Sequence, residues 1–491
     1  MINNLRYLLI IFLAVSFTDV TAQSSQTLYY MNLPQNHLLN PALRPSNKFY
    51  IGLPGLTGVN INVNNNFIRS FSDIFMRSEL NDSIITFLHP DYNVDDFLAK
   101  IKDRNSIEPE VGVQLFSLGF NAGENLYMFI DIIERVQGNV VIPRDMIRLI
   151  LKGNEEFLGS NIDLSSLHGD IKYFREAGFG FSGNISSRLR LGVRGKLLFG
   201  LATASVKNRS LGIQVNDDYT HTLNADLSVN ISGPVKVIPG DGNSVGSIEI
   251  DDSRFDSDRD KLNYLLNTRN FGLGLDFGAE YTINDKIIVS ASITDLGYIP
   301  WKTDVSNLRV DTSFMFRGLN LTDVIDGTMT FEELGNEMLD SLKNSLKMAD
   351  GKSNFTTYLP AGITVGGQYK LTKSFSVGLL SYSRLIGKQL KESLSLSANL
   401  NLGNAFSTSI SYTMANQRYD NLGAGLAFRA GIFQFYLVGD KIPVRWNKII
   451  TNGDKIPLPE TWNTLNLRAG LNLTFGNRIK VKNDRPMVVV E

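Results

Sequence analysis

Apolar and polar residues alternate along much of the chain. In residues 188–202, apolar side chains occupy most odd positions, and cations occupy four of the even ones. The four cations are Arg188, Arg190, Arg194 and Lys196. A period of two places the two sets on opposite faces of a β-strand. The alternation lasts about a dozen residues, which exceeds the usual soluble strand and matches a tilted strand crossing a bilayer.

The same pattern recurs from the first third of the chain to its end, separated alternately by tight turns and long loops. The other alternating segments are 50–64, 111–120, 126–136, 223–231, 271–283, 287–294, 361–371, 375–379, 394–402, 406–414, 422–428, 433–437 and 465–475. About 14 strands (range 12–16) of this kind predict an all-β fold, a transmembrane up-and-down antiparallel β-barrel with helical insertions.

The alternative fold is a soluble all-β sandwich or propeller. Strand length argues against it, as do aromatic residues near strand ends, which suit the two interfaces of a membrane. These aromatic residues are Tyr281, Tyr298, Trp301, Tyr369, Tyr412 and Trp462.

Two segments, residues 67–104 and 319–349, interrupt the alternation with apolar residues at helical spacing. We expect two short helices in the first, broken at Pro90, and another helical insertion in the second. A further short helix is expected at Arg144–Lys152. Such insertions either plug the lumen of a barrel, lie at its mouth or form ordinary surface helices.

The first residues have the features of a secretory signal peptide. Arg6 precedes an apolar stretch, and Val20-Thr21-Ala22 forms a small-residue cleavage site before Gln23. The apolar stretch is shorter than the ~20 residues of a membrane-spanning helix. We therefore expect a signal peptide at 1–22, cleaved between Ala22 and Gln23, and export to the bacterial outer membrane. A barrel with an N-terminal hatch is expected at 23–475, followed by a tail at 476–491.

The amino-acid composition excludes several kinds of functional site. The chain contains no cysteine, which excludes disulfides, thiolate metal sites and cysteine nucleophiles. Its four histidines lie far apart, and its net charge of −1 gives no electrostatic reason to bind nucleic acid. Catalytic motifs are missing, so we expect no enzyme, no cofactor and no metal. The expected partners are outer-membrane lipid and other envelope proteins.

One acidic stretch resembles a metal site. Asp256-x-Asp258-x-Asp260 is similar to the start of a calcium loop, but Lys261 and Asn267 stand where that loop requires Gly and Glu. A solvated acidic loop explains the stretch equally well.

The four cations of residues 188–202 allow two interpretations. They either line the lumen and attract an anion or an acidic segment, or they pair with acids of neighbouring strands. Candidate acids are Asp226, Asp276 and Glu280. Pairing is favoured, because barrel interiors are generally polar.

Tyr30-Met31 and Leu39-Asn40-Pro41-Ala42 carry a resemblance to a known group, with Tyr50–Pro54 and Phe433–Asp440 in support. The chain resembles an uncharacterised family of Bacteroidota outer-membrane β-barrels whose mature N-terminus carries Leu-Asn-Pro-Ala. It is more distantly similar to the PorP/SprF barrels of type IX secretion and gliding, and to FadL-like fatty-acid transporters. The resemblance implies an outer-membrane barrel of similar size and assigns no ligand-binding residue.

Two functions fit these observations. The first is a non-enzymatic barrel subunit of an envelope secretion or assembly machine. The alternative is a FadL-like passive transporter of a small or hydrophobic solute, in which residues 23–45 or 67–104 form the hatch.

Overall fold

The computed structural model describes residues 26–477, apart from 67–69, 71–73, 79–83, 87–88, 90–91, 219, 240–244, 317–347, 387–388, 416–417, 443–445, 452–453 and 460–463. The expected signal peptide with its Ala22–Gln23 cleavage site lies outside these residues. So do most of the expected insertion at 319–349 and nearly all of the tail at 476–491.

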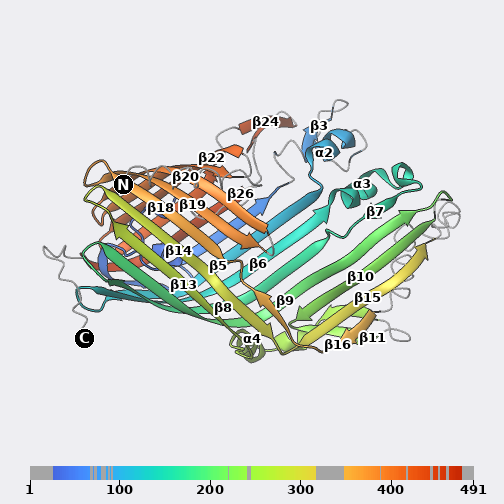
Figure 1. Cartoon of the computed structure of the whole chain (residues 1–491), viewed down its shortest axis with the longest axis horizontal. Helices are drawn as coiled ribbons and strands as arrows, with labels where there is room; N and C mark the ends of the chain where they lie inside the picture. Colours follow the sequence, from blue (N-terminus) through green and yellow to red (C-terminus); the bar gives the residue numbers. More distant parts are fainter. Residues whose placement is uncertain are drawn as a thin grey trace.

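Fourteen strand positions form a closed antiparallel barrel (Figure 1), which confirms the expected fold class. One position is shared by β1 (Asn47–Gly52) and β2 (Gly58–Asn65), which follow one another between β5 and β26 and close the barrel. The other thirteen positions, in order, are β5 (Arg104–Asn121), β6 (Leu126–Pro143), β8 (His168–Asn184), β9 (Leu189–Val215), β13 (Asn270–Thr282), β14 (Ile287–Trp301), β18 (Gly362–Lys370), β19 (Phe375–Ile386), β20 (Gln389–Leu402), β21 (Phe406–Ala415), β22 (Arg418–Ala430), β23 (Phe433–Ile442) and β26 (Thr464–Asn477).

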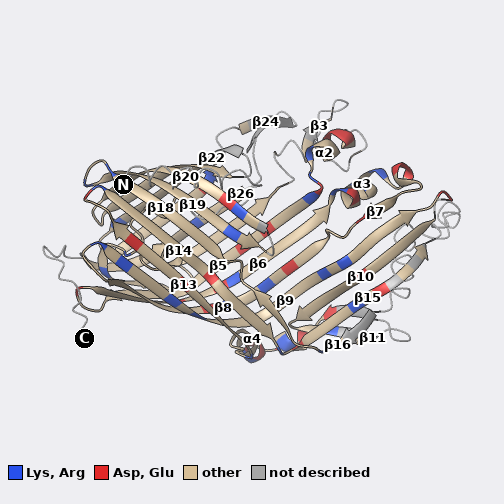
Figure 2. Ribbon diagram, in the orientation of Figure 1, with Lys and Arg blue, Asp and Glu red and all other residues tan. Residues whose placement is uncertain are grey.

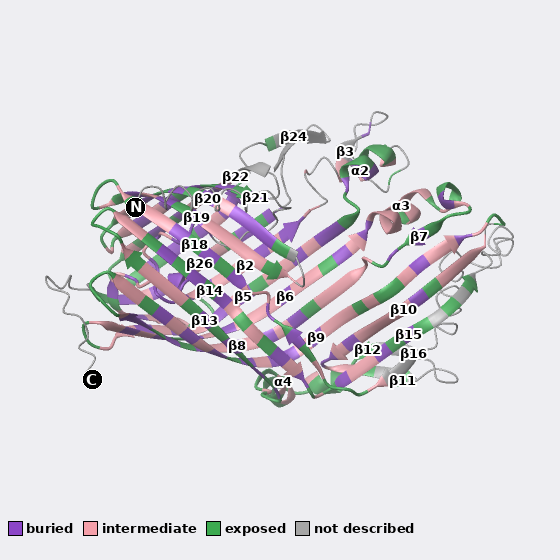
Figure 3. Cartoon of the chain, in the orientation of Figure 1, coloured by how far each residue is buried: buried purple, intermediate pink, exposed green. Residues whose placement is uncertain are grey.

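The period-two pattern decides which side chains face outward. Along β13, apolar Leu273, Leu275 and Phe277 are exposed, while the residues between them are buried. Buried residues alternate with exposed or half-buried ones on most of the barrel strands (Figure 3), and charged residues interrupt the strands at few places (Figure 2). An apolar outer face around a polar interior is the arrangement of a barrel that lies in a bilayer.

Two residues are buried instead of facing outward: Trp301, expected at a membrane interface, and Leu201, which belongs to the apolar face of residues 188–202 and is expected to face lipid. Trp301 is fully buried because it lies with Ile299 on the inward face of β14, where the two pack with Leu198. Its Nε1 donates to Thr357 Oγ1 (2.9 Å) of β17 (Phe355–Tyr358), which pairs with the end of β14. Leu201 is buried where β9 exchanges one neighbour, β13, for another, β10. The aromatic residues found exposed, as expected, are Tyr281, Tyr298, Tyr369 and Tyr412, while Trp462 lies outside the described residues.

A sheet extends beyond the barrel at one end. The far part of β9 pairs with β10 (His221–Ser232) and β7 (Asn161–Asp163), and β10 pairs with β15 (Val305–Phe316). The short β16 (Met348–Gly351) pairs with β15. Figure 1 shows this extension at the end opposite to the tight turns that join the barrel strands.

The remaining elements lie in the connections between barrel strands. The hairpins are β3 (Phe75–Arg77) with β4 (Ile84–Thr86), β11 (Val235–Pro239) with β12 (Val245–Ile250), and β24 (Trp446–Thr451) with β25 (Asp454–Pro459). The helices are η2 (Pro34–Leu38), α2 (Val94–Lys100), α3 (Arg144–Lys152), η4 (Glu155–Phe157), η5 (Asp252–Phe255) and α4 (Asp258–Leu265). None of the described helices is long and apolar enough to cross a membrane.

The helix expected in the first part of residues 67–104 is wrong. Phe75–Arg77 pairs with Ile84–Thr86 as a β-hairpin, in which the β-branched residues of the second strand favour an extended backbone. A helix does follow Pro90: α2, whose first turn is capped by Asn93 Oδ1 accepting from the Asp95 backbone N–H (3.1 Å).

The acidic stretch has structural partners. Ser257 Oγ caps α4 by accepting from the Asp260 backbone N–H (3.2 Å), and Asp258 lies in the favourable first turn of that helix. Lys236 donates to Asp251 (2.7 Å), which lowers the pKa of Asp251 to about 2. Within the described part of the chain, no three His, Asp or Glu side chains are placed to hold a metal ion.

Candidate functional site in the lumen

Residues 26–46, here called the luminal segment, lie inside the barrel. The last part of the segment lies at the end that carries the tight turns, where Arg44 donates to the Asn125 carbonyl oxygen (2.7 Å), and Gln26 lies deeper, beside Ser393 and Ser395. Residues such as Leu28, His37 and Asn40 are almost inaccessible to solvent. Hydrogen bonds hold the segment to strands from all sides of the barrel. Its partners include Asp131, Ser182, Ser290, Ser292, Ser407, Ser411, Asp440 and Asn472.

Most of these contacts are hydrogen bonds between neutral groups. Thr27 Oγ1 lies 2.6 Å from Ser411 Oγ, and Tyr29 OH lies 2.9 Å from Ser290 Oγ. Gln35 and Asn472 exchange two side-chain hydrogen bonds of 2.8 and 3.1 Å. A neutral hydrogen bond contributes a net ~0.5–1.5 kcal/mol, since water can replace either partner. The segment is therefore held by many contacts that water can replace one at a time.

The Asn40-Pro41-Ala42 motif rests against two glycines. Asn40 Oδ1 accepts from the Ala42 backbone N–H (2.9 Å), a local turn typical of Asn. Gly192 of β9 and Gly278 of β13 are direct neighbours in the sheet and face this turn. A Cβ on Gly192 would lie 2.2 Å from the Pro41 carbonyl carbon, and one on Gly278 would lie 2.0 Å from Asn40 Oδ1. Only glycine leaves room for the motif at these two positions.

Gly192→Ala is expected to loosen the luminal segment, because its methyl group would overlap the backbone of Pro41 and Ala42. The chain has no cysteine, so a single Ala42→Cys change provides a unique probe. We expect a water-soluble maleimide to label this cysteine faster in the Gly192→Ala background. Gly195→Ala on the same strand is the control, since its Cβ would meet only the Phe179 carbonyl oxygen at 3.9 Å. Equal labelling rates in the two backgrounds would contradict the seating of the motif.

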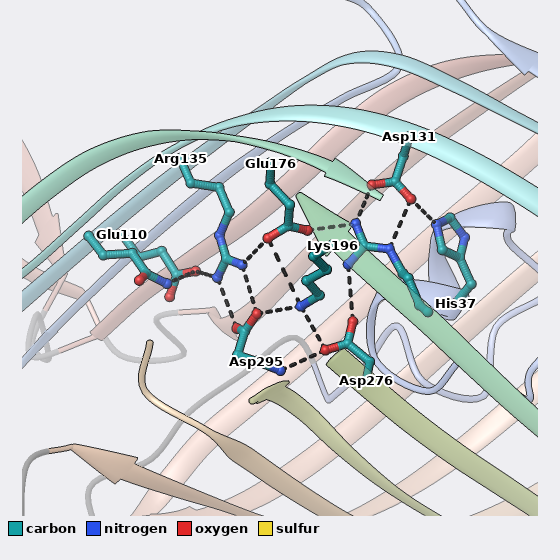
Figure 4. Close-up of polar contacts among 10 residues, drawn as sticks. His37, Glu110, Asp131, Arg135, Glu176, Lys196, Asp276 and Asp295 are labelled. Atoms are coloured by element: carbon teal, nitrogen blue, oxygen red, sulfur yellow. Dashed lines mark hydrogen bonds and ion pairs between the residues drawn. The ribbon is translucent and has the colours of Figure 1, made fainter. Parts of the chain in front are cut away.

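A continuous ionic network crosses part of the lumen beside the luminal segment (Figure 4). It joins one histidine, four cations and five carboxylates from seven strands and the luminal segment. Its members are His37, Glu110, Asp131, Arg135, Glu176, Arg194, Lys196, Asp276, Asp295 and Arg384.

Arg194 holds one end of this network together. Its guanidinium contacts Asp131, and it donates to Glu176 Oε1 (2.6 Å) and Asp276 Oδ2 (3.0 Å). Asp131 in turn lies 3.1 Å from His37 Nε2, which links the network to the luminal segment. Arg194 and these carboxylates are at least 99 % buried, so each charge depends on its partners rather than on water.

Asp295 occupies the middle of the network with a strained backbone. Its φ of +61° lies in the left-handed region, which costs a non-glycine residue on the order of 1–3 kcal/mol. The conformation lets its carboxylate accept from Arg135 (2.9 and 3.0 Å) and Lys196 (2.6 Å), while its backbone N–H donates to Asp276 Oδ1 (2.7 Å). The strained conformation of Asp295 therefore allows it to form these ionic contacts.

The four cations singled out from the sequence have different surroundings. Arg194 and Lys196 are buried in the network, and Arg190 lies nearer the turn end, where it donates to Glu280 (2.6 Å) and to Asn184 Oδ1 (3.1 Å). Arg188 is exposed in the turn before β9. Asp226, considered as a partner, lies instead near Arg209 and Arg309, because β10 neighbours the far part of β9.

Sequence reasoning missed most of the network. It did not single out Glu110, Asp131, Arg135, Glu176, Asp295, Arg384 or His37. The expected pairing with Asp276 and Glu280 is present: in the sheet, Arg194 stands directly opposite Asp276 and Arg190 opposite Glu280.

A cavity of about 120 Å³ lies between the luminal segment and the barrel wall. Gln35, Leu38 and Leu39 line it on one side, and polar wall residues line it on the other. A hollow of about 550 Å³ shares Glu110, Asp295 and Arg384 with the cavity, and a hollow of about 980 Å³ at the turn end is lined by Arg44, Arg188 and Glu280.

Comparison with known proteins finds solved structures that are remotely similar to this chain and one protein family whose model matches it. No curated protein matches the chain. The toluene transporter TbuX of Ralstonia pickettii is similar at 9 % identity and a TM-score of 0.42, over 90 % of this chain and 94 % of that one. A FadL homologue of Pseudomonas aeruginosa is similar at 9 % identity and a TM-score of 0.40, over 93 % and 99 %.

The family result covers most of the sequence. The model of DUF5723, described as a family of unknown function, matches residues 41–440. This range includes Pro41 and Ala42 of the N-terminal motif and every network residue except His37. The chain belongs to the DUF5723 family.

Proposed function

We propose that the protein is a passive transporter of small polar solutes in the bacterial outer membrane, closed at rest by its luminal segment. The observation that carries this proposal is the position of that segment. The luminal segment blocks a polar lumen that contains a cavity and has a hollow toward each end. Most contacts between the segment and the barrel wall are neutral hydrogen bonds.

The outer-membrane location is supported by the barrel itself. Closed barrels with an apolar outer face and a polar interior are the spanning structures of that membrane. The tight turns lie at one end of the barrel, and the extended sheet lies at the other (Figure 1). Short turns of such barrels face the periplasm, so we expect the extended sheet on the outside of the cell.

The cavity lining favours a polar solute over a hydrophobic one. Glu110, Arg135, Glu176, Lys196 and Arg384 all contribute to it. A hydrophobic solute would exclude water from these charged groups without providing hydrogen bonds in return, and this is costly. Of the solutes considered from the sequence, the geometry therefore supports a small, polar one.

A disulfide lock tests the proposal. In a Thr27→Cys, Ser411→Cys variant, the two sulfur atoms would replace hydroxyl oxygens that lie 2.6 Å apart, so oxidation would fix the luminal segment to β21. In proteoliposomes, we expect uptake of radiolabelled arabinose by the wild type. Uptake should fall to the level of empty vesicles in the oxidised variant and return after reduction.

The matched control links two wall strands without the luminal segment. Ser397 and Ser411 are direct neighbours across β20 and β21, so Ser397→Cys, Ser411→Cys should oxidise without loss of uptake. Uptake that persists in the oxidised Thr27–Ser411 variant, or wild-type uptake no higher than that of empty vesicles, would overturn the transport proposal.

The extended sheet favours a second candidate, a non-enzymatic subunit of an envelope secretion or assembly machine. β10 and β15 pair over twelve residues beyond the barrel and present a surface that solute passage does not require. This candidate predicts that the barrel co-purifies from native membranes with another envelope protein, and that removing the β10–β15 sheet abolishes that association. Isolation of the barrel alone would count against it.

A further inference from the structure

One cation that lines the lumen cavity is not part of the ionic network. Arg468 of β26 donates from Nε to Asn60 Oδ1 (3.0 Å), and within the described residues it forms no ion pair with a carboxylate. By contrast, Arg135, Arg194, Lys196 and Arg384 each contact at least one carboxylate. Arg468 is therefore a guanidinium that faces the cavity with donors available.

A second, independent donor lies in the same wall. Gln114 of β5 lines the cavity and is 97 % buried, yet its Nε2 has no hydrogen-bond partner. A buried donor without an acceptor costs free energy that a bound acceptor recovers. Gly58, directly opposite Gln114, and Gly112 also line the cavity and carry no side chain that could fill it.

We propose that Arg468 and Gln114 form a site for the carboxylate of a small organic anion. The planar guanidinium matches a carboxylate with two parallel hydrogen bonds, and Gln114 Nε2 supplies a third donor. The nearby acid Glu110 forms ion pairs with Arg135 and Arg384, and it makes no direct ion pair with Arg468. This inference rests on the proposed transport function and names its solute class.

Binding to the purified full barrel tests the site. Sodium acetate is titrated at constant ionic strength, and the rise in thermal unfolding midpoint gives an apparent Kd. We expect acetate to stabilise the wild type, and Arg468→Gln to weaken its binding by about tenfold or more, as the loss of charge-assisted hydrogen bonds requires. Gln114→Leu should weaken acetate binding less than Arg468→Gln does. Arg468→Lys should give an intermediate Kd, because lysine keeps the positive charge but cannot donate two parallel hydrogen bonds.

Arg429→Gln is the matched control, since Arg429 donates to the Gly431 and Thr474 carbonyl oxygens outside the cavity lining. Acetate binding to Arg468→Gln with wild-type affinity would overturn the inference. So would stabilisation by choline chloride equal to that by acetate. Stabilisation by sodium phosphate but not by acetate would also overturn the assignment to carboxylates.

The test is independent of transport. Arabinose is uncharged, so its uptake reports on the proposed transporter without involving Arg468. Normal arabinose uptake with no acetate binding would overturn this inference alone, whereas acetate binding without arabinose uptake would overturn the transport proposal alone.

Discussion

Removal of residues 26–46 is expected to convert the closed barrel into an open pore. The ionic network occupies the side of the lumen formed by β5, β6, β8, β9, β13, β14 and β19. On the opposite side, β20 and β21 present small hydroxyl side chains, among them Ser395, Ser409 and Ser411, against which the luminal segment lies. Without the segment, water would fill this side of the lumen, because short polar side chains cannot reach across it.

Single-channel recording in planar bilayers measures this effect. We expect the wild type to show rare, small openings and the deletion variant to show a steady conductance several-fold higher. A synthetic peptide with the sequence of residues 26–46, added from the turn end, should lower the conductance again by reoccupying the lumen. A deletion variant that folds, as judged by heat-dependent migration in gels, yet conducts no better than the wild type would refute the role of the segment as a plug.

The barrel could be predicted from the sequence because its signal is local. A period of two places Leu273, Leu275 and Phe277 on one face whichever strand lies beside them. Tight turns between neighbouring strands then fix an antiparallel order. The errors arose where an irregular register breaks the alternation: the pairing of β13 and β14 shifts beside Asp295, after which Trp301 faces inward, and the pairing of β8 and β9 shifts at Leu201.

The luminal site could not be predicted in the same way, because its contacts join residues far apart in the sequence. Thr27 meets Asp440, and Gln35 meets Asn472, across more than four hundred residues. No pattern within the N-terminal segment shows which wall residues it will meet. The Asn40-Pro41-Ala42 motif was visible, but its physical meaning depends on Gly192 and Gly278, which only the closed barrel brings together.

Arg194→Leu is expected to destabilise the barrel more than any other single change in the network. The substitution leaves Asp131, Glu176 and Asp276 buried with less compensating charge. Breaking a buried ion cluster by removing one partner costs ~3–5 kcal/mol, because the remaining charges cannot regain water. Urea-induced unfolding in lipid vesicles should show a decrease of this size in the free energy of unfolding.

Arg190→Leu provides the comparison on the same strand and the same face. Arg190 is about a quarter exposed and pairs with one carboxylate, Glu280, so its loss should cost no more than ~1 kcal/mol. Adding Asp131→Asn and Asp276→Asn to Arg194→Leu should restore part of the lost stability, since amides are cheaper to bury than unpaired carboxylates. Equal losses for Arg190→Leu and Arg194→Leu, or no recovery in the triple variant, would show that packing rather than charge pairing governs this part of the lumen.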